Sequence, residues 1–294
     1  MTITKPIVVT AANEDYLYPL AVMLKSLEAN LEDDCFVDLY VLFSFFPEQG
    51  RHEITNSLNS AKLNLKWIEV NHNKLSELKV DGHVSVATYY RLLIEDIFTE
   101  FDKVIYLDAD LVVNRCISKI WNASFRGKHL LAVPHASKKS GLVSGERGLP
   151  SYKLLGIPEN TRTFNAGVLI MNLKLWRRDS ISEKVIEYLK KYQAYVLWWD
   201  QDGLNAILYN KWLPLPSVWN VMTNHLVTFT TWEDSLLPKQ VYLTISRSPA
   251  IVHYAGPSKP WLPNYVGPFY KLYLEYATKY SDKLRNQSDI YEKA

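Results

Sequence analysis

Hydrophobic residues occur along this 294-residue chain in short continuous runs that alternate with stretches of helical spacing. The runs at residues 6–12, 36–42 and 65–70 have the length and apolar character of buried strands. Between the first two runs, residues 20–27 place their apolar side chains on one helical face. Between the second and third runs, residues 53–61 also predict a helix. Strands that alternate with helices predict an α/β fold with a mostly parallel central sheet flanked by helices.

The second half of the chain continues this alternation. Apolar runs at residues 104–107 and 164–173 predict further buried strands, and residues 87–101 and 182–192 predict helices. Residues 269–294 predict a terminal helix with Tyr and Leu on one face. Ligands of α/β sheets bind at the carboxyl ends of the strands, so polar residues that follow a strand are the first candidates for chemistry.

Two carboxylates interrupt the apolar pattern in the middle of the chain. Asp108 and Asp110 separate the runs 104–107 and 111–113. Two like charges beside each other among apolar residues are unfavourable unless a cation lies between them. Carboxylate oxygens suit Mg²⁺ or Mn²⁺, which complete their coordination with water and substrate phosphates. The alternative is that both acids are solvated turn residues that follow a strand.

The composition narrows the class of protein. Hydrophobic residues make up 48% and charged residues 22%, which is typical of a globular chain and excludes a disordered or collagenous one. The net charge of +2 argues against a nucleic-acid partner, which requires a strong basic excess. The two cysteines, Cys35 and Cys116, do not make a disulfide scaffold, and we interpret Cys116 as a small core residue.

The N-terminus enters a strand almost at once, without the charged, apolar and small-residue segments of a secretory signal. No apolar run approaches the roughly 20 residues that a membrane-spanning helix needs. We therefore expect a cytoplasmic protein. A peripheral association with the inner face of the plasma membrane stays open, with weak support from the nearly balanced charges of the terminal helix.

Three further segments each allow two interpretations. Arg91 and Glu95 are four residues apart on the predicted helix 87–101, so a surface ion pair is the simplest reading of Arg91. Residues 137–162 are rich in Gly and Pro, which is consistent with a lid over a substrate or with a tolerated surface insertion. Asp200 could simply cap the helix that carries Leu204.

Other strand ends also carry residues suited to ligands. Gly167, near the start of the run 164–173, lets a ligand or another backbone approach closely. The apolar run 250–252 leads into Gly256 and Lys259, and a lysine beside an approachable backbone suits a phosphate. The first strand is followed by neither a Gly-x-Gly-x-x-Gly fingerprint nor a Gly-Lys-Ser/Thr phosphate loop.

Taken in order, six segments resemble glycosyltransferase family 8, over residues 7 to 262. They are the opening strand with its polar turn, HVSVATYYRL, YLDADLVV, FNAGVLIMNLKLWRR, DQDGLNAIL and HYAGPSKPW. Within that family the chain is most similar to the bacterial galactosyl- and glucosyltransferases of lipooligosaccharide and related surface glycans. The resemblance implies a single nucleotide-diphospho-sugar transferase domain of the GT-A type, residues 1–263, followed by a helical tail, residues 264–294.

The resemblance also implies an activity. The expected enzyme is a retaining, UDP-sugar-dependent hexosyltransferase that uses Mn²⁺, with Mg²⁺ as an alternative. Its donor would be a UDP-hexose, with galactose and glucose both open, and its acceptor a saccharide, glycolipid or glycoprotein in cell-surface polysaccharide synthesis.

Individual residues acquire expected roles from the same resemblance. It implies three metal ligands, Asp108, Asp110 and His253, with Gln201 nearest the anomeric carbon and Asp200 as the candidate for a carboxylate role. The residues that it implies for substrate binding are Ala11, Asn13, Asp15, His83, Val84, Val86, Ala109 and Leu111 toward the nucleotide, Arg91, Asn165 and Ala166 toward the donor sugar or phosphate, and Gly256 and Lys259 toward the diphosphate.

Two positions depart from the family pattern. The first polar turn begins with Asn13 where an acid is usual, although an Asn amide can still accept a hydrogen bond from N3–H of uracil. His135 occupies a position where an Asp is frequent, so the family's acceptor contacts are not carried over to this chain.

For the chemistry, we favour attack by the acceptor hydroxyl on the face that the leaving phosphate vacates, with that phosphate as base and Gln201 as a positioning group. A covalent intermediate on Gln201 is less favourable because an amide is a poor nucleophile. Three alternatives stay open: a glycogenin-like self-glucosylating protein, a non-catalytic glycan-binding protein on the same fold that uses its tryptophans as stacking platforms, and a nucleotide-sugar hydrolase.

Overall fold

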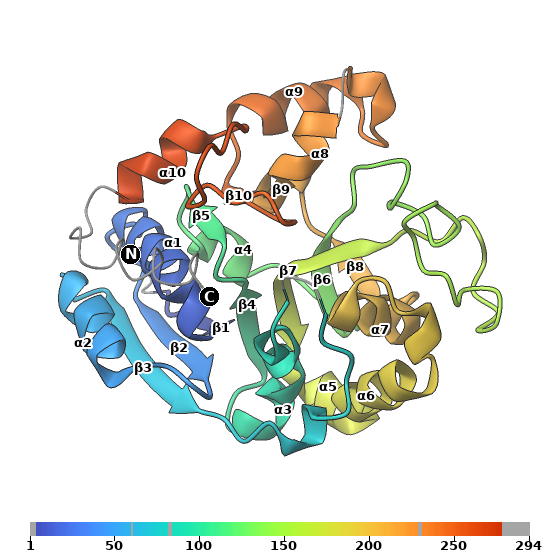
Figure 1. Ribbon diagram of the computed structural model, residues 1–294, viewed down its shortest axis with the longest axis horizontal. Helices are drawn as coiled ribbons and strands as arrows, with labels where there is room; N and C mark the ends of the chain where they lie inside the picture. The colour runs from blue at the N-terminus through green and yellow to red at the C-terminus, as the bar shows by residue number, and fades with distance from the viewer. Residues whose placement is uncertain (1–3, 60, 82–83, 229–230, 278–294) are drawn as a thin grey trace.

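A seven-stranded sheet forms the centre of the protein, and a three-stranded sheet lies beside it (Figure 1). The computed structural model describes residues 4–59, 61–81, 84–228 and 231–277. In spatial order, the larger sheet contains β3 (Leu63–Glu69), β2 (Val37–Phe43), β1 (Ile7–Ala11), β4 (Lys103–Leu107), β7 (Phe164–Asn172), β6 (Leu130–Pro134) and β8 (Trp212–Pro214). The smaller sheet contains β5 (Leu111–Val113), β10 (Ile251–His253) and β9 (Val221–Met222).

Most strand pairs of the larger sheet are parallel. β1 runs parallel to β2 and β4, β2 to β3, and β6 to β8, whereas β7 is antiparallel to both of its neighbours. Val8 and Val9 of β1 belong to different core clusters, one on each face of the sheet, so burial on both faces explains the continuous apolar run. The predicted α/β fold with a mostly parallel central sheet is confirmed.

Helices cover both faces of this sheet. Leu24 of α1 belongs to the core cluster on one face, and Val185 of α6 and Leu204 of α7 belong to the cluster on the other. The α-helices of the described residues are α1 (Leu17–Ala29), α2 (Glu48–Ser57), α3 (Ile94–Ile97), α4 (Ser118–Trp121), α5 (Leu173–Asp179), α6 (Ile181–Lys191), α7 (Trp199–Leu208), α8 (Thr223–Thr228), α9 (Lys239–Arg247) and α10 (Tyr270–Ala277). None of the helices in the described part of the chain combines the length and apolarity needed to cross a bilayer.

Two predicted helices have different bounds in the structure. The helix predicted at 53–61 begins earlier, at Glu48, because Pro47 occupies its N-cap and Glu48 places an acid in the first turn. It ends where Leu58 takes an extended conformation. The predicted terminal helix 269–294 is α10 over Tyr270–Ala277, and residues 278–294 lie outside the described part of the chain.

The segment predicted as one α-helix at 87–101 is instead a 3₁₀ helix, η3 (Val86–Leu93), followed by the single-turn α3. A 3₁₀ helix has three residues per turn, so side chains three apart lie on the same side. Thr88 and Arg91 are three apart, and both face Asp200 of α7. The tighter winding of η3 therefore brings the side chains of Thr88 and Arg91 to the same carboxylate.

The connection between the sheets positions the acidic residues. The backbone N–H of Asp108, just after β4, donates to the carbonyl oxygen of Gly167 at 2.9 Å, and the chain then turns into β5. β10 pairs antiparallel with β5, with His253 opposite Leu111. Strand pairing thus brings a histidine from the end of the chain beside the two acids from its middle.

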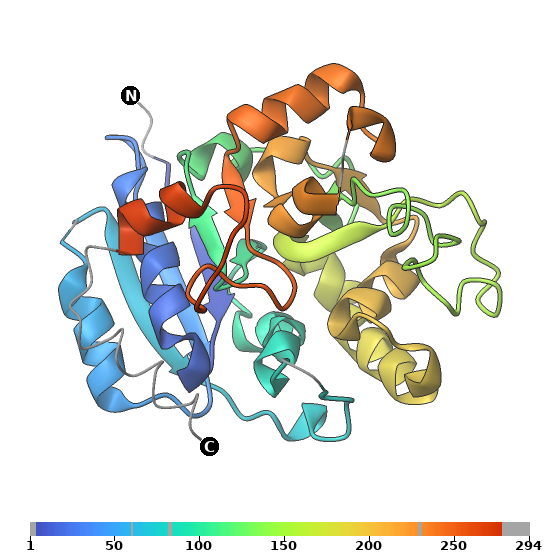
Figure 2. The same ribbon diagram turned by 45° about the horizontal axis from the view of Figure 1, so that its top comes forward.

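The last helix of the described residues, α10, packs against the first α-helix, α1. α10 lies next to α1 in both views of the molecule (Figures 1 and 2), and Asn30 Nδ2 donates to the hydroxyl of Tyr276 at 2.9 Å. Tyr273 and Tyr276 are buried in the same core cluster as Leu24 of α1.

Candidate active site

A cleft of about 840 Å³ opens where β1 and β4 end. Most of the expected site residues line it: Ala11, Asn13, Val84, Arg91, Asp108, Ala109, Asp110, Asn165, Ala166, Asp200, Gln201, His253, Gly256 and Lys259. Three do not, since Asp15 is exposed, Val86 lies at the start of η3, and Leu111 is a core residue of β5. His83 lies outside the described residues.

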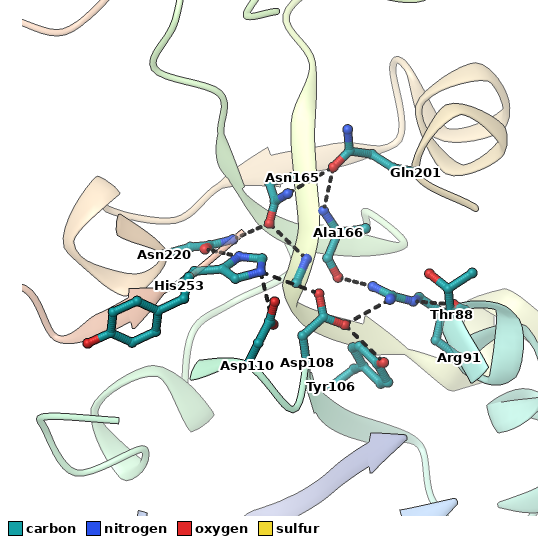
Figure 3. Close-up of polar contacts among 12 residues, drawn as sticks. Thr88, Arg91, Tyr106, Asp108, Asp110, Asn165, Ala166, Gln201, Asn220 and His253 are labelled. Atoms are coloured by element: carbon teal, nitrogen blue, oxygen red, sulfur yellow. Dashed lines mark hydrogen bonds and ion pairs between the residues drawn. The ribbon is translucent and has the colours of Figure 1, made fainter. Parts of the chain in front are cut away.

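Asp108, Asp110 and His253 converge at one point of the cleft (Figure 3). One ligand atom from each lies within 4.8 Å of the others. Nε2 of His253 is 3.2 Å from Oδ1 of Asp110 and 3.7 Å from Oδ2 of Asp108. Oxygen donors with one imidazole nitrogen suit a divalent ion such as Mn²⁺ or Mg²⁺.

A chain of side-chain amides sets the tautomer of His253 (Figure 3). Nδ2 of Asn220 donates to Oδ1 of Asn165 at 2.7 Å, so Oδ1 of Asn220 is the acceptor for Nδ1–H of His253 at 3.0 Å. With its proton on Nδ1, the ring turns the lone pair of Nε2 toward the two acids. A metal-ligating histidine is commonly held in this way by a hydrogen bond to its other nitrogen.

Gly167 leaves the space that His253 and Asp108 occupy. A Cβ atom at this position would lie 2.4 Å from Cε1 of His253 and 2.7 Å from Oδ2 of Asp108. The close approach that the sequence predicted at Gly167 is therefore made by side chains of the protein itself.

Arg91 is buried at the centre of a polar network, so the surface pair with Glu95 was wrong. Its guanidinium donates to Oδ1 of Asp108 at 2.8 Å and to the carbonyl oxygen of Ala166, pairs with Oδ2 of Asp200 at 2.9 Å, and lies over the ring of Tyr106. Burial alone would lower the pKa of Arg91, but the two carboxylates raise it above its ordinary value. The 3₁₀ winding of η3, which the pattern of the sequence does not reveal, turns this side chain inward.

A second buried cation pairs with the other acid. Nζ of Lys259 donates to Oδ2 of Asp110 at 2.5 Å and to the carbonyl oxygen of Tyr254 at 2.8 Å. Burial opposes ionisation of Asp110, but the ammonium of Lys259 beside it holds its pKa well below the usual range. Asp110 is therefore ionised at neutral pH, and each of the two acids has a basic side chain beside it.

Gln201 bonds the start of β7 and not the two acids. Its Oε1 accepts from Nδ2 of Asn165 at 2.9 Å and from the backbone N–H of Ala166 at 3.2 Å (Figure 3). Because both partners are donors, the carbonyl oxygen of the amide is identified and its NH₂ group points away from them. The side chain is thus held by the first residues of β7.

The acids of α7 have separate partners. Asp200 is buried, accepts from the hydroxyl of Thr88 at 3.0 Å and pairs with Arg91. Burial raises the pKa of Asp200 to about 6. The cap predicted for Asp200 is not formed, since no side chain caps the start of α7. Asp202, in the first turn of the helix, instead accepts from the backbone N–H groups of Leu197 and Trp198 ahead of it, at 2.7 and 3.0 Å.

In the turn after β1, the side chain of Asn13 presents an acceptor oxygen to the cleft. Nδ2 of Asn13 donates to Oδ2 of Asp15 at 2.9 Å, which leaves Oδ1 of Asn13 buried and without a hydrogen-bond partner in the described part of the chain. Nearby, the ammonium of Lys259 lies 6.0 Å from the ring centroid of Tyr16 and 5.5 Å from that of Trp261.

His135 lies in the cleft wall next to another histidine. The ring centroids of His135 and His225 are 5.4 Å apart. Burial and the neighbouring imidazole lower the pKa of His135 far below its ordinary value, and burial lowers that of His225 to about 4. Both rings are therefore neutral at pH 7. From the long segment 137–162, Ser137 to Ser140 and Arg147 also line the cleft.

Several residues of the site were missed in the sequence. Asn220, Thr88 and Tyr106 each bond a residue that the sequence did single out, and Asp202 bonds the backbone just before Asp200 and Gln201. Asp202 had a detectable signal, since an acid shortly after a turn and before an apolar helical pattern is typical of a helix start. Asn220 reaches His253 only through the pairing of β9 with β10, which local pattern does not reveal.

Comparison with known proteins identifies relatives with this fold. The family model described as glycosyl transferase family 8 matches residues 7–264. General stress protein A of Bacillus subtilis is 29% identical over 273 residues, 92% of each chain. The lipopolysaccharide 1,3-galactosyltransferase of Salmonella typhimurium is 26% identical over 253 residues, 85% of this chain and 71% of that one. The crystal structure of the galactosyltransferase LgtC with donor and acceptor sugar analogs is similar with a TM-score of 0.77 and 26% identity, over 94% of this chain and 96% of that one.

Proposed function

The chain belongs to glycosyltransferase family 8, and we propose that it is a retaining hexosyltransferase that moves galactose or glucose from a UDP-sugar to a glycan or glycolipid. The observation that carries this proposal is the convergence of Asp108, Asp110 and His253 in a large cleft, with the cations Arg91 and Lys259 beside the acids. Such an arrangement suits a divalent ion together with a diphosphate.

The donor set fits Mn²⁺, with Mg²⁺ as the alternative. Two carboxylate oxygens and a nitrogen of His253 lie close together, and Asn220 orients the ring. Bound there, the ion would stabilise the negative charge that develops on the leaving diphosphate. Lys259 would add a second positive charge, and Arg91 would hold the carboxylate of Asp108 in place.

The turn after β1 supports uracil as the base. Asn13 presents an acceptor oxygen, since its amide nitrogen is engaged by Asp15. Uracil carries a hydrogen on N3, whereas the N3 atom of cytosine is an acceptor and would oppose Oδ1 of Asn13. We therefore propose UDP-sugars as the donors.

The contacts of Gln201 support a positioning role in the transfer. Its carbonyl oxygen already accepts two hydrogen bonds, from Asn165 and Ala166, which weakens an amide oxygen further as a nucleophile. Its NH₂ group remains for a substrate hydroxyl. In the proposed reaction the acceptor hydroxyl attacks the anomeric carbon from the side that the diphosphate leaves, and the departing phosphate takes the hydroxyl proton.

The identity of relatives supports the acceptor class. The Salmonella typhimurium relative is a lipopolysaccharide galactosyltransferase, so we propose a saccharide or glycolipid of a cell-surface polysaccharide as the acceptor. Such acceptors are assembled at membranes, which is consistent with a cytoplasmic enzyme at the inner face of the plasma membrane.

The test is UDP release with Mn²⁺ from a panel of UDP-hexoses, with and without simple sugar acceptors. We expect turnover with one hexose, faster with acceptor, and metal-dependent UDP binding in calorimetry. The variants Asp108→Asn and Asp110→Asn should lose about 10²-fold or more in turnover and weaken Mn²⁺ binding by about 10- to 100-fold.

A matched control is Asp96→Asn, which removes an exposed acid paired with Lys74. It should retain wild-type turnover. Full activity and unchanged metal affinity in Asp108→Asn would exclude the proposed metal site. If the wild type showed neither UDP-sugar turnover nor metal-dependent UDP binding, the proposed hexosyltransferase activity would be excluded.

A further inference from the structure

The turn before α7 has an unusual backbone. Trp199, the first residue of α7, has a φ of +46°, in the left-handed region that bulky side chains rarely adopt. Of the described residues other than glycine with such a φ, Trp199 is the one in the cleft wall. Asp200 and Gln201 follow it directly. A strained conformation persists when surrounding contacts hold it, and such conformations gather at functional sites.

Contacts from both sides hold this turn. From inside, Oδ2 of Asp202 accepts from the backbone N–H groups of Leu197 and Trp198, and the N–H of Gln201 donates to the carbonyl oxygen of Trp198 at 3.0 Å. From outside, the indole N–H of Trp199 donates to Oδ1 of Asp81 at 3.1 Å.

The indole of Trp198 is tied to a different part of the chain. Its N–H donates to the carbonyl oxygen of Arg147, in the segment 137–162, at 3.1 Å. The two rings meet edge to face, with centroids 6.4 Å apart. Each tryptophan thus anchors the turn to one wall of the cleft, and the segment with Asp81 lies just before Val84 and Thr88 in the other wall.

We propose that Trp199 is a positioning residue: its left-handed backbone, held by the hydrogen bond to Asp81, sets the direction in which Asp200 and Gln201 enter the cleft. Asp200 must reach Thr88 and Arg91, while Gln201 must reach Asn165 on β7. These two consecutive side chains therefore bond different elements, and the bend at Trp199 allows both to do so. The role in transfer rests on the proposed function, whereas the strain and the placement of Gln201 do not.

The first test compares variants of Asp81. Asp81→Ala removes the acceptor, and Asp81→Asn keeps an oxygen that can accept from the indole. Asp81 also pairs with Lys79 at 2.8 Å, so Lys79→Ala is the control for loss of that ion pair. We expect kcat to fall about tenfold in Asp81→Ala with the KM for the donor nearly unchanged, and both Asp81→Asn and Lys79→Ala to stay within about twofold of wild type.

A second readout separates positioning from a loss of folded enzyme. If Gln201 is displaced, water competes better with the acceptor, so the ratio of transfer to hydrolysis should fall in Asp81→Ala and recover in Asp81→Asn. A fall in the amount of folded enzyme lowers both rates and leaves the ratio unchanged. Wild-type turnover in Asp81→Ala, or equal defects in Asp81→Ala and Asp81→Asn, would overturn the proposed role of the hydrogen bond.

The third test does not depend on activity. Trp199→Gly relieves the left-handed strain and Trp199→Ala retains it, while both lose the indole, so Trp199→Gly should have the higher melting temperature. In NMR spectra, the side-chain NH₂ signal of Gln201, assigned with Gln201→Ala, should shift in Asp81→Ala and not in Asp81→Asn. An equal or higher melting temperature for Trp199→Ala, or an unmoved Gln201 signal, would overturn the proposal even if no UDP-sugar is turned over.

Discussion

A methyl group at position 167 has no room, because His253 and Asp108 fill the space above Gly167. Asn220 holds the ring of His253 and Arg91 holds the carboxylate of Asp108, so neither can move away without losing a partner. We expect Gly167→Ala to weaken Mn²⁺ binding by about tenfold or more in calorimetry. Val168→Ala, in the same strand, should reduce stability by about 1–3 kcal/mol and leave Mn²⁺ affinity unchanged. Wild-type Mn²⁺ affinity in Gly167→Ala would show that the site tolerates the methyl group.

Arg91 balances two acids, so its removal affects stability as well as function. Its side chain is 4% exposed and pairs with Asp108 and Asp200. Arg91→Met retains much of the volume and leaves both carboxylates without this partner, which should cost about 3–5 kcal/mol of unfolding free energy in denaturant titrations. Lys74→Met removes an exposed pair, with Lys74 69% and Asp96 53% exposed, and should cost less than about 1 kcal/mol. Similar losses in the two variants would contradict the buried network.

At the scale of elements, the start of α7 should make stability depend on pH. Burial raises the pKa of Asp202 to about 7, whereas an unfolded Asp titrates near ~3.9. Between these values the folded protein retains a proton that the unfolded chain has lost. The resulting stabilisation is full below about pH 4 and is lost as the pH rises through 7.

Asp202→Asn removes this titration and keeps an acceptor for the N–H groups of Leu197 and Trp198. Between about pH 5 and 8, the wild type should therefore lose more unfolding free energy than the variant, by roughly 2–3 kcal/mol. Unfolding titrations at both pH values measure the difference. Parallel pH profiles would show that Asp202 titrates in the folded protein as it does in the unfolded chain.

The elements also show how far the sequence could be interpreted. The strands were predictable because burial on both faces leaves uninterrupted apolar runs, and Asp108 and Asp110 stood out against that pattern. η3 was not predictable, because Thr88 and Arg91 turn inward to meet Asp200, a contact far away in the chain. The positions of most expected site residues around one cleft follow from the family resemblance, whereas their mutual bonds required the structure.

At the scale of the whole molecule, we propose that residues 1–263 form the catalytic domain and that α10, in the described part of the tail 264–294, stabilises it. Tyr273 is 2% exposed in the core cluster shared with α1. Tyr273→Ala should therefore cost about 3–5 kcal/mol of unfolding free energy, in a single cooperative transition. Lys271→Ala, on an exposed position of the same helix, is the control and should change stability little. A wild-type midpoint for Tyr273→Ala would show that α10 is dispensable.

The pairing of β10 with β5 limits which insertions and deletions the gene can accept during evolution. Opposite Leu111, His253 points toward the acids, and because side chains alternate along a strand, a shift of one residue turns it to the other face. A single codon inserted within β5, or within β10 ahead of His253, would thus turn this proposed metal ligand away from the acids while leaving every amino acid of the site encoded. The strand pairing of the segment 137–162 consists of isolated bridges, one from Ser137 to Ser235 and one within the segment between Leu142 and Arg162, so codons can be gained or lost there. Lineages that keep the chemistry should differ in length in that segment and not in these two short strands.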